Sequence, residues 1–312
     1  MPLYKVMAEK KISVMIPTYN CAHLLQKTIE SVLDQDLGEE LMQIEVIDDC
    51  STDNPEQIVK DHGRGRVRFF RQEKNVKHVK NFQTAINRAE GEIIHLLHGD
   101  DYVLPGFYTA MLKMYADFPE IKACFSRNYN VNGVGEIIHT SALMQEKNGV
   151  LKDFFSIEVT DQFIQTPSIT VKKEVYQTIG TFNPALSWTE DWEMWARIAK
   201  HYPMGYITTP LACYRVHDTS STSSKSLTGE NVLDLIRLKE ILLSYCDTKE
   251  LREKCNSSLN RIIFEFASKN YVAASKVDKK LSRTHLLMII KYAPNFKSKW
   301  YHIMIYIRLL LY

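Results

Sequence analysis

The stretch EIIHLLHGDD, from Glu92 to Asp101, is an apolar run that ends in two adjacent carboxylates. Its length, its isoleucines and the nearby glycines are typical of a buried strand followed by a loop. Two like charges at the end of a buried strand repel each other, and partial burial adds a cost of desolvation. Asp100 and Asp101 therefore need a reason to stand together, either a bound cation or the geometry of a turn.

Strands of the same kind alternate with helices before this stretch. Runs of β-branched and apolar residues predict strands over 11–17, 43–48, 66–72 and 92–99. Apolar residues at helical spacing, with Asn-Pro or glycine at some of the ends, predict helices over 22–35, 54–63 and 78–91. This alternation predicts an α/β fold with a mostly parallel sheet flanked by helices. Ligands of such sheets bind beyond the carboxyl ends of the strands.

The later part of the chain is less regular. Periodicity is weak from 131 to 175; the pattern then predicts a helix within 186–203 and a strand pair or an extended segment over 205–217. The Ser/Thr-rich stretch 218–231 is typical of a loop or linker, and only helices are expected after it, because Gly229 is the last glycine. We expect a domain over 1–224, with halves at about 11–130 and 131–224, and a helical C-terminal region over 225–312.

Composition excludes several classes of protein. The 312 residues carry a formal net charge of +2 and 45% hydrophobic residues, which argues against a dedicated nucleic-acid binder. The six cysteines form no C-x-x-C pair and no disulfide framework, which fits a reducing cytoplasm. The first residues contain no apolar segment typical of a secretory signal, and no apolar run reaches the length of about 20 residues that a spanning helix needs. We therefore expect a cytoplasmic protein.

The pair Asp100 and Asp101 suits a divalent cation. Mg²⁺ and Mn²⁺ prefer oxygen ligands and often use one or two carboxylates, with phosphates and water completing the shell. A turn explains Gly-Asp-Asp equally well, since these residues favour turns.

Two further polar clusters follow the first and second predicted strands. DDCSTD begins at Asp48, and its Ser51–Asn54 part fits a helix cap before Pro55. Capping does not explain Asp48 and Asp49, whose carboxylates could accept the imide N–H of a uracil or contact a ribose hydroxyl. In PTYN, from Pro17 to Asn20, the asparagine suits an N-cap, whereas Tyr19 could offer its ring to a nucleobase.

TEDWEMW, from Thr189 to Trp195, opens a predicted helix with Glu190 and Asp191. Ordinary capping by Thr189 or Asp191 explains acidic residues at this point, because the helix dipole favours them. Three tryptophans crowd the pair, however, which indicates a partly desolvated pocket or a sugar-stacking surface. Poor solvation would raise a carboxylate pKa toward the range of a general base. His217, further on, could contact a diphosphate or a metal, although a lone histidine at a strand end is more often structural.

In this order, the clusters resemble those of the family 2 glycosyltransferases, which have the GT-A fold, and in particular enzymes of bacterial surface-polysaccharide synthesis. The resemblance runs from Ile12 to about Ser224 and rests on five short motifs. These are ISVMIPTYN, VIDDCSTD, AEGEIIHLLHGDDYVLP, VYQTIGTFNPALSWTEDWEMWARIA and YRVHDTSSTS.

The resemblance implies a role for each cluster. Tyr19 and the backbone at Pro17 and Thr18 would contact the nucleobase, Asp49 would bind the uracil N–H, and Asp48 would support the same loop. Asp101, helped by Asp100, would ligate Mn²⁺ or Mg²⁺, with His217 as a further ligand. Asp191 would be the catalytic base, with Glu190 contacting the acceptor or orienting the base.

The implied reaction is inverting transfer of a sugar from a nucleotide-diphosphate donor to an acceptor hydroxyl. The acceptor would belong to surface glycan or lipid-linked oligosaccharide synthesis. UDP is the expected carrier, because an aspartate that accepts a uracil imide does not pair with guanine in the same way.

Two departures from the family pattern stand out. Similar enzymes often carry a glycine shortly after the position of Asn75, where this chain has Val76 and Lys77. Lys77 or Lys80 could still reach a phosphate. The acidic motif also lacks its first aspartate, since His98 and Gly99 precede the acids.

The C-terminal segment has no acidic residue from Leu281 onward. Its last part, 297–312, combines basic, aromatic and apolar residues and is too short to span a bilayer. It suits an interfacial helix on the cytoplasmic face of an anionic membrane, or a helix packed on the catalytic domain or on a second subunit of a homo-oligomer.

Other functions fit less well. A sugar-nucleotide pyrophosphorylase would need a glycine-rich basic loop in place of PTYNCAH, and a dinucleotide oxidoreductase would need G-x-G-x-x-G. A catalytically inactive nucleotide- or glycan-binding module of the same fold stays open, although Asp49, Asp101 and Asp191 argue for an enzyme.

Overall fold

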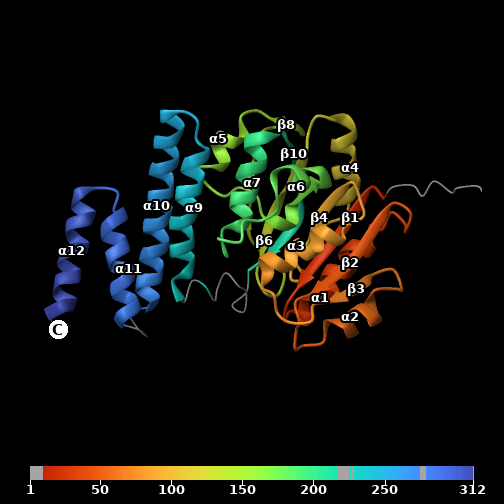
Figure 1. Cartoon of the computed structure of the whole chain (residues 1–312), viewed down its shortest axis with the longest axis horizontal. Helices are drawn as coiled ribbons and strands as arrows, with labels where there is room; N and C mark the ends of the chain where they lie inside the picture. The colour runs from red at the N-terminus through yellow and green to blue at the C-terminus, as the bar shows by residue number, and fades with distance from the viewer. Residues whose placement is uncertain (1–9, 217–224, 226–227, 275–278, 312) are drawn as a thin grey trace, which may run out of the picture. The chain divides into compact units, whose positions relative to one another are not determined.

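The computed structural model describes residues 10–216, 225, 228–274 and 279–311 (Figure 1). The chain forms two compact units. The first contains the residues up to 154 together with 163–184 and 197–216. The second contains 155–162, 185–196 and the residues from 217 onward. A domain boundary at residue 224 stays a prediction.

The first unit is built on one mixed sheet with the strand order β3-β2-β1-β4-β9-β6-β10-β5. Four strands run parallel on one side of it and confirm the predicted parallel sheet. They are β1 (Ile12–Thr18), β2 (Met42–Asp48), β3 (Arg68–Arg71) and β4 (Ile93–Leu96). Their carboxyl ends therefore meet at one edge.

Helices with one apolar face cover this part of the sheet, as the sequence predicts. They are α1 (Ala22–Leu33), α2 (Pro55–His62) and α3 (His78–Arg88). A further helix that the sequence analysis did not specify, α4 (Phe107–Asp117), packs against the other half of the sheet. In α1 the fully buried residues Leu25, Ile29 and Val32 recur at intervals of three and four, so one face packs into the core. Gly91 closes the turn between α3 and β4, where an added Cβ would lie 2.6 Å from the Ile12 carbonyl carbon.

The other half of the sheet is mixed because β9 runs antiparallel between β4 and β6. Its strands are β5 (Tyr102–Val103), β6 (Ala123–Val131), β7 (Ile137–Thr140), β8 (Gly149–Leu151), β9 (Ile169–Lys172) and β10 (Met204–Arg215). Short helical pieces join them: α5 (Phe154–Glu158), the 3₁₀ turn Thr166–Ser168 and α6 (Lys173–Ile179). These elements are too short to give a clear period, which explains the weak pattern from 131 to 175.

The stretch predicted as a strand pair or an extended segment is the single strand β10. Its register against β6 shifts on both sides of Pro210, because proline cannot donate to the ladder. The interruption by Thr-Thr-Pro therefore marks an irregularity within one strand, and the strand-pair alternative was wrong.

The second unit is helical. It contains the first part of α7 (Glu190–His201), then α9 (Glu230–Tyr245), α10 (Lys249–Ala274), α11 (Lys279–Tyr292) and α12 (Phe296–Leu311). Fully buried leucines and isoleucines of α9 to α11 form one core with Trp192 of α7. The prediction of an all-helical C-terminal region is confirmed for the described residues. None of their helices is both long enough and apolar enough to cross a membrane.

Candidate functional site

The carboxyl ends of β1, β2 and β4 bring the first three polar clusters to one edge of the sheet. Thr18, at the end of β1, pairs with Asp48, at the end of β2, and the acidic loop follows β4 on the other side of β1. This is the edge that the sequence pattern predicted for a ligand.

Asp101 is the most unusual group at this edge, because its side chain is only 1% exposed. Its Oδ1 accepts the Arg215 backbone N–H at 2.8 Å. Its Oδ2 is buried and accepts no hydrogen bond from the described residues. Burial, and secondarily the charge of Asp100, raises the pKa of Asp101 well above its ordinary range. A buried carboxylate oxygen without a donor is costly unless something positive binds it.

His98 stands beside this oxygen, with its Nδ1 at 3.6 Å from Asp101 Oδ2. Its ring stacks on Phe82 with the centroids 5.1 Å apart. His98, Asp100 and Asp101 each offer a ligand atom within 4.8 Å of the others, so the donor set fits one divalent cation. In the sequence, His98 stands out only as the residue at the place of a missing aspartate; a histidine in H-x-D-D after a strand was the available signal.

The acidic loop is fixed by its neighbours. The Thr28 hydroxyl, from α1, lies 3.0 Å from the Gly99 carbonyl oxygen and 2.6 Å from that of Asp101. Gly99 donates its N–H to the carbonyl of Pro17, which is buried in β1. A Cβ at Gly99 would lie 2.7 Å from Thr18 Oγ1, so only glycine fits this approach.

Asp48 holds its own loop together. Its carboxylate accepts the Ser51 hydroxyl and backbone N–H, and it lies 3.1 Å from the Arg71 guanidinium. The side chain is completely buried. These contacts agree with the supporting role that the resemblance implied for Asp48.

Asp49 lies next to it and is 2% exposed. Its Oδ1 accepts the Val76 backbone N–H at 2.6 Å, which ties the β2 loop to the segment before α3. Burial raises the pKa of Asp49, while the backbone N–H groups of Val76 and Lys77 lower it.

Lys77 adopts the backbone conformation of a glycine, with φ +72° and ψ 155°. This region is almost restricted to glycine, because a Cβ is strained there. The departure seen in the sequence is therefore a change of residue and not of backbone shape. The side chains of Lys77 and Lys80 are exposed.

Tyr19 presents its ring at the surface beside these loops, with 51% of the residue exposed. Asn20 is not the N-cap of α1; that residue is Cys21, and the Ala22 N–H donates instead to the Asp53 carboxylate at 2.7 Å. Asn20, at φ +50°, uses its side-chain oxygen to accept the Thr52 N–H at 2.8 Å. The prediction that Asn20 caps α1 was wrong because its side chain bonds across the two loops and not within one. The predicted cap before Pro55 is in place, since Asn54 is the N-cap residue of α2, although its side chain makes no capping hydrogen bond.

The second unit holds the other acidic cluster. Asp191 Oδ2 accepts a hydrogen bond from Gln162 Nε2 at 2.8 Å, and Oδ1 accepts the Trp192 N–H at 2.7 Å. Burial, followed by the neighbouring charge of Glu190, raises the pKa of Asp191 to about 7. A carboxylate with this pKa can accept a proton near neutral pH.

Asp234, on α9, fixes the turn before α7. Its buried carboxylate accepts the backbone N–H groups of Ser187, Trp188 and Thr189 at 2.9–3.3 Å, and the Thr189 hydroxyl at 3.0 Å. Sequence reasoning missed Asp234, because nothing in an amphipathic helix marks one acidic residue as the anchor of a distant turn.

The tryptophans around this pair belong to the core. Trp192 and Trp195 are 2% and 1% exposed, and Trp192 Nε1 donates to the Glu158 carbonyl at 2.6 Å. Trp188 packs edge-on against Phe266. The expected desolvation is present, whereas a sugar-stacking surface made of Trp192 and Trp195 is not. His217, the further metal ligand implied by the resemblance, lies outside the described residues.

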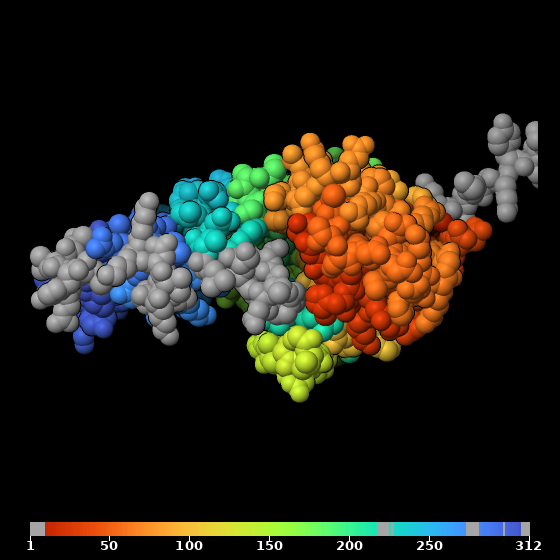
Figure 2. All heavy atoms as spheres, turned by 90° about the horizontal axis from the view of Figure 1, so that it is seen from below, coloured from red at the N-terminus to blue at the C-terminus, as the bar shows by residue number. Residues whose placement is uncertain are grey.

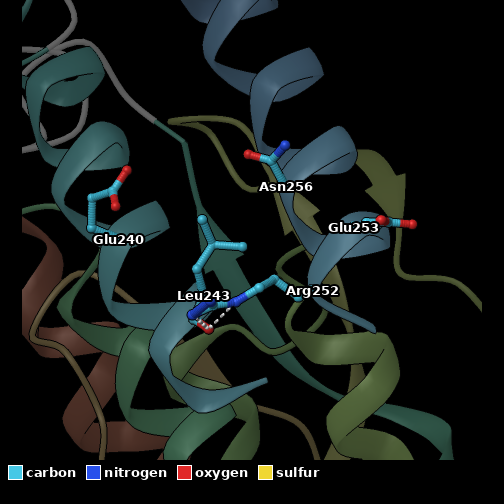
Figure 3. Close-up of a pocket in the computed structure, with 5 residues that line it drawn as sticks. All are labelled: Glu240, Leu243, Arg252, Glu253 and Asn256. Carbon is cyan, nitrogen blue, oxygen red and sulfur yellow. Dashed lines mark hydrogen bonds between the residues drawn. The ribbon is translucent and has the colours of Figure 1, made fainter. Parts of the chain in front are cut away.

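A separate pocket of about 350 Å³ in the second unit is lined by α9 and α10 residues (Figure 3). The Arg252 guanidinium, through Nε and Nη2, donates to the Leu243 carbonyl at 3.3 and 2.9 Å. Because this arginine satisfies a carbonyl near the end of α9, the pocket is explained by helix capping.

Comparison with known proteins identifies the family. The sequence profile of glycosyl transferase family 2 matches residues 13–180, which is more than half of the chain. The chain belongs to glycosyl transferase family 2. The match includes the loops after β1, β2 and β4 and ends before α7.

Two relatives illustrate how far the similarity extends. The chain is 26% identical over 221 residues to the chondroitin synthase of Escherichia coli, covering 69% of this chain but only 30% of that protein. It is 26% identical over 218 residues to an uncharacterised glycosyltransferase of Methanocaldococcus jannaschii, covering 69% of this chain and 73% of the relative.

Solved structures share the fold at lower identity. TarS residues 1–349 of Staphylococcus aureus match with a TM-score of 0.66 and 18% identity, covering 91% of this chain and 81% of that fragment. The mannosyltransferase PcManGT of Pyrobaculum calidifontis, in complex with GDP-Man and Mn²⁺, matches with a TM-score of 0.59 and 16% identity, covering 96% and 85%. The family 2 chain is thus a glycosyltransferase with the GT-A fold, as predicted.

Proposed function

We propose that this family 2 enzyme transfers a sugar from a UDP-sugar to an acceptor hydroxyl with inversion. The observation that carries the proposal is the buried, unpartnered Oδ2 of Asp101, which lies in the loop at the carboxyl end of β4. An orphaned carboxylate oxygen beside a loop suited to a nucleotide is what a donor diphosphate with its cation requires.

The proposed nucleotide pocket lies at the ends of β1 and β2. Asp49 is an acceptor-only group when ionised and would receive the uracil imide N–H, while the exposed ring of Tyr19 would stack on the base. The structures of TarS with UDP and with UDP-GlcNAc support uracil as the base. PcManGT, by contrast, was solved with GDP-Man, so an experiment has to decide between uracil and guanine.

The residues His98, Asp100 and Asp101 would hold the divalent cation. When bound, the ion neutralises the negative charge that grows on the departing diphosphate. An imidazole among the ligands favours Mn²⁺ over Mg²⁺, which prefers a shell made of oxygens. Lys77 and Lys80, exposed on the neighbouring segment, are the proposed phosphate contacts.

Asp191 is the proposed general base. Its pKa of about 7 leaves it able to take the proton of the acceptor hydroxyl, and Gln162 orients its carboxylate. The hydroxyl oxygen then attacks the anomeric carbon as the bond to the diphosphate breaks, so a single displacement inverts the configuration. Glu190 would contact the acceptor and hold the pKa of Asp191 high.

The proposed acceptor belongs to a surface glycan or a lipid-linked oligosaccharide. Relatives named chondroitin synthase and poly(ribitol-phosphate) β-N-acetylglucosaminyltransferase support a polymeric acceptor. α12 exposes Trp300, Tyr301 and Met304 beside basic residues, which supports contact of 297–312 with an anionic membrane at the cytoplasmic face. Docking of the same helix on a second subunit is the competing proposal.

A donor screen tests the activity. The intact protein is incubated with UDP-, dTDP- and GDP-sugars and Mn²⁺, and nucleotide release is measured with and without a mixture of lipid-linked glycans. Release from UDP-sugars that increases with the glycans and is lost in Asp191→Asn supports the proposal. Nucleotide binding without turnover of any donor would favour an inactive binding module instead.

A further inference from the structure

A pocket of about 290 Å³ opens on the first unit beside the acidic loop. Its walls come from α1, β5, the β6–β7 turn and the end of β10. They include His23, Lys27, Tyr102, Val134, Gly135 and Arg215. Figure 2 shows the segment around residues 133–147, in yellow-green, standing out from the surface, and its side chains at 134, 137 and 138 are exposed. The volume is at the lower end of the range for small-molecule sites.

Positive charge gathers in this pocket around one aromatic ring. Lys27 Nζ lies 5.6 Å from the centre of the Tyr102 ring, and the Arg215 guanidinium carbon lies 5.4 Å from it. His23 adds a third nitrogen side chain. None of the described residues that line the pocket is acidic. The two cations repel each other across the ring, and an anion bound between them would relieve that repulsion.

Arg215 is held in place, whereas Lys27 is not. The Arg215 side chain donates to the carbonyl oxygens of Asp100 and Gly133 at 2.8 and 3.2 Å, and the residue is 7% exposed. Lys27 is exposed on α1, and the described residues give it no hydrogen bond or ion pair. Holding the fold therefore explains Arg215, whereas among the described residues only the cation–π contact with the Tyr102 ring places Lys27 over the pocket.

The strand order separates the strand residues of this pocket from the proposed nucleotide loops, while His23 and Lys27 lie on α1, which begins directly after the β1 loop. Those loops follow β1 and β2, and the acidic loop follows β4. The pocket's strand residues come from β5, β10 and the turn after β6, which lie on the other side of β4 in the sheet. A donor diphosphate at the acidic loop would thus have its nucleotide on one side and this pocket on the other.

We propose that the pocket of His23, Lys27, Tyr102 and Arg215 binds an oxyanion, a phosphate or a carboxylate, carried by the acceptor. The inference deepens the proposed transfer reaction and rests on it. Lys27 and Arg215 supply the charge, and Tyr102 supplies a flat surface for the sugar or polyol next to the anion. The acceptor is then an acidic glycan or a polyol phosphate and not a neutral sugar.

Paired probes test this assignment. Methyl β-glucuronide is compared with methyl β-glucoside, and glycerol phosphate with glycerol, by NMR titration of the intact protein in the presence of UDP and Mn²⁺. We expect at least one charged probe to bind about tenfold more tightly than its neutral partner. Lys27→Met should remove that preference and Lys27→Arg should restore it, whereas Lys113→Met, at an exposed position on α4, should change nothing.

A parallel titration with UDP and Mn²⁺ separates the possible failures. UDP affinity that is unchanged in Lys27→Met supports an acceptor site. Equal binding of charged and neutral probes to the unaltered protein overturns the proposal. UDP affinity that falls together with probe affinity in Lys27→Met also overturns it, because the cations would then serve the donor diphosphate. If UDP does not bind the unaltered protein at all, the proposed function fails, and an anion preference that survives would mark a site unrelated to transfer.

Discussion

Two aspartates at the same sheet edge, Asp48 and Asp101, are both buried, but the described residues supply donors to both carboxylate oxygens in only one of the two. Asp48 is surrounded by donors from Ser51 and Arg71, so the fold itself satisfies its charge. Asp101 has one donor, the Arg215 N–H, and a second oxygen with none among the described residues. The difference separates a carboxylate that stabilises a loop from one that is prepared for a cation.

Asp101→Asn should therefore stabilise the metal-free protein by roughly 1–2 kcal/mol and so raise its melting temperature, because burial disfavours the ionised carboxyl group and an amide carries no charge. It should also abolish the rise in melting temperature that Mn²⁺ gives the unaltered protein. Thermal unfolding with and without Mn²⁺ measures both effects. The matched change Asp48→Asn should destabilise by about 1–3 kcal/mol and keep the response to Mn²⁺. A destabilised Asp101→Asn that still responds to Mn²⁺ would show that Oδ2 binds no ion.

The raised pKa of Asp191 predicts the pH dependence of turnover. A general base works only when it is deprotonated, so nucleotide release should rise with pH through about 7 and then level off. Glu190→Gln should move this midpoint to lower pH, because it removes the like charge that helps to raise the pKa. Initial rates from about pH 5 to pH 9 supply the profile; a midpoint that Glu190→Gln leaves in place would contradict the coupling of the two carboxylates.

At the scale of elements, the backbone of the segment from Asn75 to Lys80 is strained at Lys77, and a substitution can test this. Lys77 has a backbone conformation that favours glycine, so Lys77→Gly should stabilise the protein by about 1 kcal/mol despite the greater freedom of an unfolded glycine. The same change at Lys80, inside α3, should destabilise by about 1 kcal/mol. Chemical denaturation of both variants gives the comparison, and opposite signs are the expected result. Equal losses would mean that the segment relaxes away from the positive φ.

The turn before α7 depends on α9 through Asp234. Asp234→Ala removes the acceptor of three backbone N–H groups and should destabilise by about 2–3 kcal/mol. Turnover should fall more than UDP affinity does, since the turn positions Asp191 and the nucleotide loops lie in the other unit. Glu265→Ala, which removes a half-exposed pair with Arg261 on α10, is the matched control and should cost less than about 0.5 kcal/mol. Equal effects of the two changes on turnover would remove the anchoring role of Asp234.

The elements that the sequence predicted well are those with local causes. The four parallel strands and α1 to α3 appear where β-branched runs, helical periodicity and helix-end residues indicate them, with ends that differ by a few residues. The contacts that complete the site have no local signal. Examples are the bond between Asp49 and Val76, the support of Asp191 by Gln162, and the anchoring of the turn before α7 by Asp234. Each depends on segments that only the tertiary fold brings together.

At the scale of the whole molecule, family membership accounts for the donor half of the reaction more fully than for the acceptor half. The family profile ends at residue 180, before Glu190 and Asp191, and the chain spans only 30% of the chondroitin synthase that it resembles. The nucleotide and cation groups therefore rest on shared motifs, whereas the acceptor groups rest on this chain's own contacts.

The central claim is that the acidic loop holds a nucleotide diphosphate through a divalent cation. Calorimetric titration of UDP into the intact protein, with and without Mn²⁺, tests it on the unaltered chain and on Asp101→Asn. UDP binding should weaken at least about tenfold without Mn²⁺, and to the same extent in the variant with Mn²⁺ present. UDP binding of equal strength with and without the ion, or no nucleotide binding under either condition, would contradict it.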